Sequence, residues 1–235
     1  MMPLYFGPSG RARYGVYEPA AGPISRTGAL ICPPMGAEYY HSHAVCRALA
    51  VRLAKAGVHT LRFDYLGTGD SALEPEDVGV RDWLEDIELA ATELRDMADL
   101  TTLRLIAIRA GAGLSLVASK AGLPFDGIAL WDPIPLPDVA VQGHPVGALP
   151  DPRVPSDSPF VPRPGALPEG SLLLSTDGTF EGAAAFVGML DADDAGLAVV
   201  RHDERRPWDE EAVAPGRVPV PVRSLQTIVE WARAG

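Results

Sequence analysis

The sequence has no excess of positive charge. Its 235 residues carry 20 Lys and Arg against 31 Asp and Glu, a formal net charge of -11. Non-specific binding to nucleic acid depends on clustered Lys and Arg, and anionic membrane surfaces attract the same cations. Neither nucleic acid nor a membrane surface is therefore an expected partner.

Long apolar runs and a cysteine framework are also missing. No run approaches the roughly 20 apolar residues that a membrane span needs, and the N-terminus lacks the basic start and apolar core of a signal peptide. The two cysteines, Cys32 and Cys46, have no metal-ligand spacing and are predicted to be buried free thiols. We predict a cytoplasmic protein without a metal site or a disulfide.

Alternating strands and helices are the main feature that is present. After an N-terminal hairpin over 3–18, apolar periodicity predicts strands at 27–32, 58–63, 103–108, 127–131, 172–175 and 196–200. Helices are predicted at 42–56, 81–97, 112–121, 180–190 and 222–232. The alternation favours a single α/β domain over 1–235, with a mostly parallel central sheet and helices on both faces.

Several segments carry candidate features without a strong chemical signal. The loop 64–71, DYLGTGDS, is predicted to be a tight, backbone-exposed turn; its GxG is weak evidence for a nucleotide, so no cofactor is predicted. Residues 133–168 hold 11 of the 23 prolines, which favours an extended surface loop. Acidic side chains of the 81–97 helix are expected to form a solvated face: Asp82, Glu85, Asp86, Glu88 and Glu93. The acidic turn at Asp191, Asp193 and Asp194 has no calcium-loop pattern.

The segment 103–113, LRLIAIRAGAG, has the pattern of a central strand that turns sharply into a helix. In α/β-hydrolases such a turn presents the nucleophile, with small residues two positions away on either side because the turn is tight. Ala107 and Gly111 are small, as required, but Arg109 stands between them. A guanidinium stays protonated and has no free lone pair, so Arg109 cannot be a nucleophile.

Longer motifs carry a family resemblance over about residues 4–133. They are LYFGPSGRARYGVYEP, CPPMGAEYYHSHAVCRALAVRLAKAGVHTLRFDYLGTGDS, RAGA and LWDP. Together they resemble the α/β-hydrolase group of serine-aminopeptidase-like or exosortase-system-associated hydrolases, some of which also resemble this chain in carrying Arg at the nucleophile position. The resemblance implies an α/β-hydrolase fold, here with the cap reduced to the proline-rich loop 133–168.

The same resemblance implies where the remaining machinery would lie. The nucleophile position is 109, Asp177 matches the acid, and His202 is a candidate for the histidine. Backbone N–H groups of Ala110 and of the loop holding Met35 and Gly36 would stabilise an oxyanion.

Other residues could replace the missing hydroxyl or serve the pocket. Ser115 and Ser71 are weak alternative nucleophiles: we expect Ser115 to bond a backbone carbonyl and Ser71 to satisfy local backbone groups. His41 and His43, at the start of a helix, are expected in surface or capping roles, and their spacing does not suit a metal.

The sequence leaves two roles open for Arg109. A partly desolvated cation needs a counter-charge, and Glu38 and Asp132 are the candidates in the sequence, with Glu38 favoured. Alternatively, Arg109 and the Ala110 N–H bind a carboxylate or phosphate.

Two functions follow from these alternatives. One is a degenerate hydrolase, non-catalytic or catalysing without a covalent acyl intermediate, that binds a small molecule or a partner protein in a biosynthetic or export pathway. The other is an active ester, thioester or peptide-bond hydrolase in which Asp177 and His202 activate water. The sequence leaves the oligomeric state open.

Overall fold

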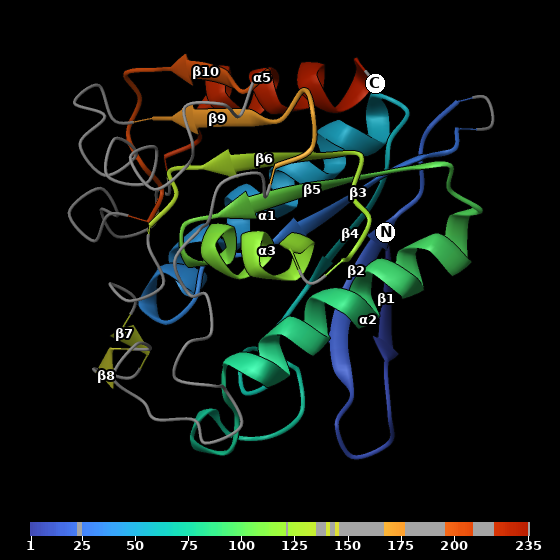
Figure 1. Ribbon diagram of the computed structural model, residues 1–235, viewed down its shortest axis with the longest axis vertical. Coiled ribbons are helices and arrows are strands. Elements are labelled where there is room, and N and C mark those ends of the chain that lie inside the picture. Colours follow the sequence, from blue (N-terminus) through green and yellow to red (C-terminus); the bar gives the residue numbers. More distant parts are fainter. Residues whose placement is uncertain are drawn as a thin grey trace.

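An eight-stranded sheet forms the centre of the computed structural model, which describes residues 1–22, 25–120, 122–134, 140–141, 144–145, 167–176, 196–208 and 219–234. The strand order is β1-β2-β4-β3-β5-β6-β9-β10 (Figure 1). The strands are β1 Met2–Phe6, β2 Arg13–Glu18, β3 Thr27–Cys32, β4 His59–Phe63, β5 Thr102–Ile108, β6 Gly127–Trp131, β9 Leu172–Ser175 and β10 Ala198–Arg201. The β1–β2 and β2–β4 pairs are antiparallel and all others are parallel, so the predicted, mostly parallel sheet is confirmed.

Helices cover both faces of this sheet. They are α1 Ala37–Lys55, α2 Val80–Ala98, α3 Ala110–Lys120 and α5 Val222–Arg233, with a short 3-10 turn at Pro75–Asp77. One apolar core lies under α2 and α3 and includes Trp83 and Leu114, while the other lies under α1 and α5 and includes Leu49 and Ile228. Figure 1 shows α2 and α3 in front of the sheet and α1 and α5 behind it. The central strands read as continuous apolar runs because they are buried on both sides.

Helix α1 begins five residues earlier than the apolar spacing predicts. Gly36 supplies the N-cap with φ of 63°, a conformation that glycine adopts without steric cost. Glu38 therefore lies in the first helical turn and not in a loop. A carboxylate is favoured there because the helix N-terminus carries partial positive charge. His41 and His43 accordingly lie within α1.

The prediction that the α2 acids form a solvated face is wrong for two of them. Asp82 is 6% exposed and Asp86 is fully buried. Asp86 accepts from the Arg13 Nε at 2.6 Å, and Arg13 is also fully buried. Asp82 accepts from Arg11 Nη2 at 2.7 Å and from the Gly79 N–H at 2.8 Å. The β1–β2 hairpin brings these arginines onto α2, a contact that helical periodicity does not reveal.

The loop 64–71 is also less exposed than predicted. Asp64, Tyr65 and Leu66 are all buried, and the Leu66 N–H donates to Asp86 at 2.8 Å. Ser71 meets its expectation, since its hydroxyl donates to the Asp64 carbonyl and accepts from the Tyr14 N–H.

Other predictions have mixed outcomes. Cys32 and Cys46 are buried free thiols, as predicted. Within the described ranges, no helix is long and apolar enough to cross a membrane. The predicted helix 180–190 and most of the proline-rich loop lie outside the described residues; within that loop, β7 Ala140–Val141 pairs with β8 His144–Pro145.

Candidate functional site

The candidate site lies where the parallel strands end. Strands β3, β5, β6, β9 and β10 run in the same direction, so the residues that follow them gather at one edge of the sheet. In open α/β sheets this edge is where ligands bind. Arg109 follows β5 directly, and α3 begins at the next residue.

The backbone at Arg109 is in the left-handed region, with φ of 55°. This conformation costs a non-glycine residue of the order of 1 kcal/mol or more. The surrounding structure holds it: the Arg109 N–H donates to the Trp131 carbonyl at 3.1 Å, and the Arg109 carbonyl accepts from the Ala112 N–H at 3.0 Å. The chain thus passes from strand to helix in a single sharp turn.

Close packing explains the small residues on either side of this turn. Ala107 is fully buried. A Cβ atom added to Gly111 would lie 2.7 Å from the Cys32 carbonyl oxygen and 2.8 Å from that of Pro33. Helix α3 can therefore approach the end of β3 because position 111 has no side chain.

Arg109 forms an ion pair with Glu38, as predicted. Its Nη2 lies 2.8 Å from Glu38 Oε1, and its Nε lies 3.1 Å and 3.2 Å from the two carboxylate oxygens. Its Nη1 donates to the Asp132 carbonyl oxygen at 3.1 Å. The side chains of Arg109 and Glu38 are 16% and 28% exposed, so the pair is largely withdrawn from solvent. Two-point contact between a guanidinium and a carboxylate is stronger than a single bond and fixes orientation.

The side chain of Asp132, the other candidate counter-charge, binds Thr176 and not Arg109. Its carboxylate accepts from the Thr176 N–H at 2.8 Å and from the Thr176 hydroxyl, which ties the end of β6 to the end of β9. Burial raises the pKa of Asp132, against the lowering effect of these hydrogen bonds and of Arg109. Asp132 therefore contacts Arg109 through its backbone.

Trp208 lies against the guanidinium, a contact that was not predicted from the sequence. The Arg109 Cζ lies 5.9 Å from the centre of the Trp208 ring. Trp208 is 2% exposed and packs edge-on against Trp131 with ring centres 5.2 Å apart. The signal in the sequence was an isolated tryptophan within a charged segment, a residue type that seldom remains exposed.

The proposed oxyanion donors lie next to this ion pair in the chain. Met35 and Ala110 are buried at 4% and 1% exposure, and Gly36 has the positive φ noted above. Within the part of the chain that the structure describes, the N–H groups of Met35 and Ala110 have no intramolecular acceptor. These donors remain free to bind an anion.

Of the predicted acid and histidine, only His202 lies among the described residues. Asp177 lies outside them. His202 follows β10, and its N–H donates to the Ser175 carbonyl at 2.8 Å. Its Nε2 hydrogen-bonds the Thr227 hydroxyl on α5 at 2.9 Å, so the ring is held against that helix.

The alternative nucleophiles and ligands have other surroundings. Ser115 is fully buried beside Cys32, and the expected bond from its hydroxyl to a backbone carbonyl does not form. His43 Nε2 contacts Arg62 Nη1 at 3.3 Å, whereas His41 Nδ1 is buried without a partner. Among the described residues, no group of His, Cys, Asp and Glu side chains is placed to hold a metal ion.

Comparisons with known proteins show the fold. No family model matches the chain, and no curated protein matches it in sequence. Solved structures do match: a lidless α/β serine hydrolase from Xanthomonas campestris has 16% identity and a TM-score of 0.65, over 99% of this chain and 91% of the other. A carboxylesterase from Lactobacillus plantarum has 14% identity and a TM-score of 0.63, over 98% and 95%.

A monoglyceride lipase variant from Saccharomyces cerevisiae is similar at 11% identity, with a TM-score of 0.61 over 99% of this chain and 95% of the lipase. The strand order and these similarities together define an α/β-hydrolase fold. At these identities the likeness concerns the fold, and the chemistry has to be argued from the site.

Proposed function

We propose that this chain is a hydrolase-fold protein without a serine nucleophile, which binds a small molecule and does not form an acyl-enzyme. The observation that carries the proposal is Arg109 at the sharp β5–α3 turn, held by Glu38 and by the Asp132 carbonyl. A protonated guanidinium in that position has no electron pair for attack on a carbonyl carbon. An accessory role in a biosynthetic or export pathway is compatible with this chemistry.

The site retains donors suited to an anion. Arg109 has five N–H bonds, and the contacts to Glu38 and Asp132 use Nε, one Nη1–H and one Nη2–H. Two N–H bonds therefore remain, and the N–H groups of Ala110 and Met35, which lie close to Arg109 and Glu38 in the chain, are also free. A carboxylate matches this set because it accepts several hydrogen bonds at once.

Active hydrolysis by activated water is the less favoured function. It requires a histidine that accepts a proton from water, and the His202 Nε2 already hydrogen-bonds Thr227, which leaves only Nδ1 for that role. We therefore do not propose the Asp177–His202 mechanism.

A fluorophosphonate probe tests the absence of a nucleophile. We expect no stoichiometric labelling of the purified protein and no turnover of p-nitrophenyl esters above that of the Arg109→Gln/Glu38→Gln variant. Labelling of any serine would overturn the proposal, as would ester turnover lost in His202→Ala.

Ligand binding is tested by calorimetry with sodium benzoate. The double variant Arg109→Gln/Glu38→Gln removes both charges together, so the comparison avoids leaving one of them buried alone. We expect the wild type to bind benzoate and the double variant to bind it at least tenfold more weakly. Equal binding by the two proteins, or none by either, would exclude Arg109 as the anion anchor.

A further inference from the structure

A second concave surface lies away from the candidate site, between α2 and α3. The cavity has a volume of about 640 Å³ and is lined by Arg81, Asp82, Leu84, Glu85, Glu88, Ala118, Gly122 and Leu123. Its size falls within the range of ligand-binding clefts. We call these residues the α2–α3 groove.

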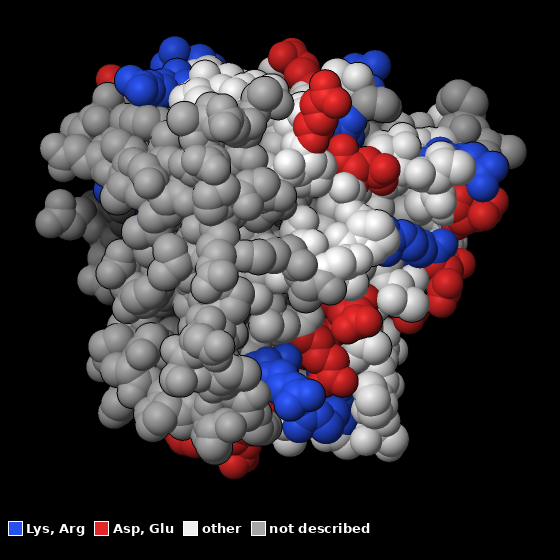
Figure 2. Space-filling view, viewed as in Figure 1, with Lys and Arg blue, Asp and Glu red and all other residues white. Residues whose placement is uncertain are grey.

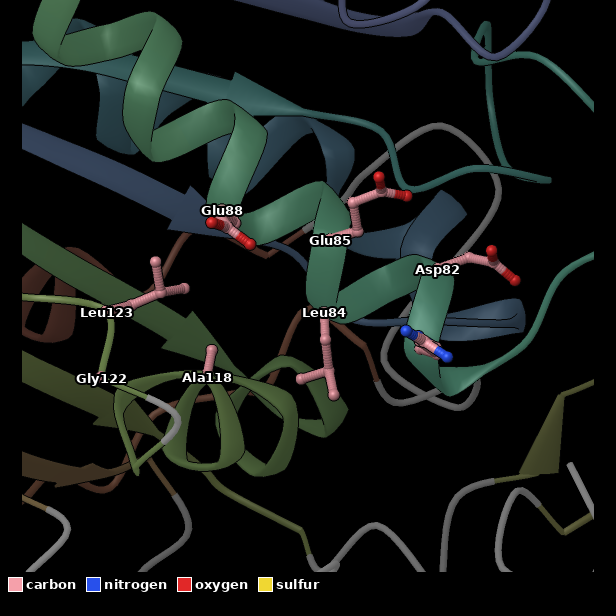
Figure 3. A pocket seen from close by; sticks show the side chains of 8 residues that line it. Asp82, Leu84, Glu85, Glu88, Ala118, Gly122 and Leu123 are labelled. Atoms are coloured by element: carbon pink, nitrogen blue, oxygen red, sulfur yellow. The ribbon is translucent and has the colours of Figure 1, made fainter. Parts of the chain in front are cut away.

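The floor of the groove is apolar. In Figure 3 the side chains of Leu84, Ala118 and Leu123 point into the space between the two helices. Leu84 and Leu123 are half-buried, so part of their apolar surface still faces solvent. Covering that surface would be favourable by about 25 cal/mol per Å².

The charged rim of the groove is asymmetric. Asp82 is bonded to Arg11 and Gly79, and Glu85 is bonded to Arg13 at 3.2 Å. Glu88 stands above Leu123 in Figure 3, is exposed, and has no cationic partner among the described residues. Arg81 lies seven residues earlier on α2, about 10 Å away along the helix axis at 1.5 Å per residue.

The wider electrostatics favour a cationic occupant. The whole chain carries a net charge of -11, and the groove lining holds three acidic residues against one basic residue. Figure 2 shows acidic and basic side chains interspersed over the described part of this face. A net negative charge raises the rate at which a cationic partner arrives and disfavours an anionic one.

We infer that the α2–α3 groove docks a basic amphipathic segment of a partner protein, whose apolar side chains cover Leu84, Ala118 and Leu123. A Lys or Arg of that segment pairs with Glu88. Arg81 repels a second cation at the other end, so the segment lies in one direction along the groove. This inference does not depend on the function proposed for Arg109.

A labelled synthetic peptide provides the test. The probe is a fluorescein-labelled 14-residue peptide of Leu, Ala and Lys, with Leu recurring at i, i+4 and i+7. Fluorescence anisotropy at low salt is expected to show saturable binding, weakened at least tenfold by Glu88→Lys. The matched control is Asp96→Lys, an exposed site on the same helix outside the groove with the same charge change, which is expected to alter the affinity less than twofold.

Any one of four results would overturn the inference. Equal weakening by both variants would show attraction to net charge alone. Equal binding of a peptide with every Leu replaced by Ala, or equally tight binding of spermine, would show that the apolar floor is not used. Absence of saturable binding up to about 1 mM protein would also contradict the inference, because a Kd of 1 mM corresponds to a binding free energy of only about -4 kcal/mol.

Discussion

Arg109 combines a strained backbone with a guanidinium that is paired to Glu38 on one side. The left-handed φ is unfavourable for arginine, and the ion pair and the Asp132 carbonyl hold the side chain in one orientation. A serine at this position would leave Glu38 without its cation. The two residues therefore function as a unit, and a change at either has to be interpreted together with the other.

A double-mutant cycle measures this coupling. We expect Arg109→Met and Glu38→Gln each to lower the free energy of unfolding by about 1–2 kcal/mol, between the values for exposed and for buried pairs. The double variant should lose less than the sum, because neither charge is then left unpaired. Urea denaturation of the four proteins is the measurement, and strict additivity would show that the pair contributes nothing.

The sequence predicted this ion pair but missed the ring beside it. A cation at the end of a central strand requires a counter-charge. Few acidic residues lay close to Arg109 in the expected fold, and Glu38 was therefore predicted to be its partner. Trp208 lies 99 residues after Arg109. Its contact depends on how the segment after β10 returns across the strand ends, which no local pattern encodes.

At the scale of elements, helix α2 was predicted correctly, but tertiary contacts bury two of the acidic residues that were expected to face solvent. The helix and its apolar face were predicted from periodicity, yet the hairpin buries Asp86 together with Arg13. Polar residues on a helix are expected to face solvent unless another element supplies their partners. Here β2 supplies the partner from 73 residues away.

We expect Asp86→Asn to lower the free energy of unfolding by about 3 kcal/mol, because it removes the buried carboxylate bonded to the Arg13 Nε and leaves only the half-exposed Glu85 as a counter-charge. The matched control is Glu88→Gln, exposed on the same helix, for which a change within about 0.5 kcal/mol is expected. Chemical denaturation compares the two. Equal small effects would mean that solvent reaches Arg13 in solution.

The approach of α3 to β3 gives a second prediction at this scale. Gly111→Ala places a Cβ against two backbone carbonyls that cannot move aside, so we expect a loss of about 2–3 kcal/mol in the free energy of unfolding. Gly28→Ala meets the flexible end of Leu100 and should cost less than about 1 kcal/mol. Thermal denaturation compares the two variants. A larger loss of stability in Gly28→Ala than in Gly111→Ala would contradict the close packing of α3 against the end of β3.

The whole molecule should depend on pH through its buried carboxyl groups. Burial raises the pKa of Asp64, and hydrogen bonds from Tyr39 and from the Asp70 N–H offset this in part. The folded state then binds the proton more tightly than the unfolded state. The contribution of Asp64 to stability is therefore complete below its unfolded pKa and is lost as the pH rises through its raised folded pKa.

Unfolding free energies measured between pH 4 and pH 7 test this sign. As the pH falls from 7, wild type should gain stability relative to Asp64→Asn, which cannot take up the proton. The control Asp96→Asn, at an exposed position on α2, should follow the wild-type profile. A wild-type curve that runs parallel to that of Asp64→Asn would contradict the raised pKa.

The sequence by itself determined the order of strands and helices, the sharp turn at Arg109 and the absence of a nucleophile there. These depend on local periodicity, on the small residues Ala107 and Gly111, and on the chemistry of one side chain. The tertiary structure decided which charges are buried and which donors remain free. Those properties arise from contacts between residues about 70 to 100 positions apart, such as Arg13 with Asp86 and Arg109 with Trp208. Electrostatic interactions between such residues become strong when burial removes them from water.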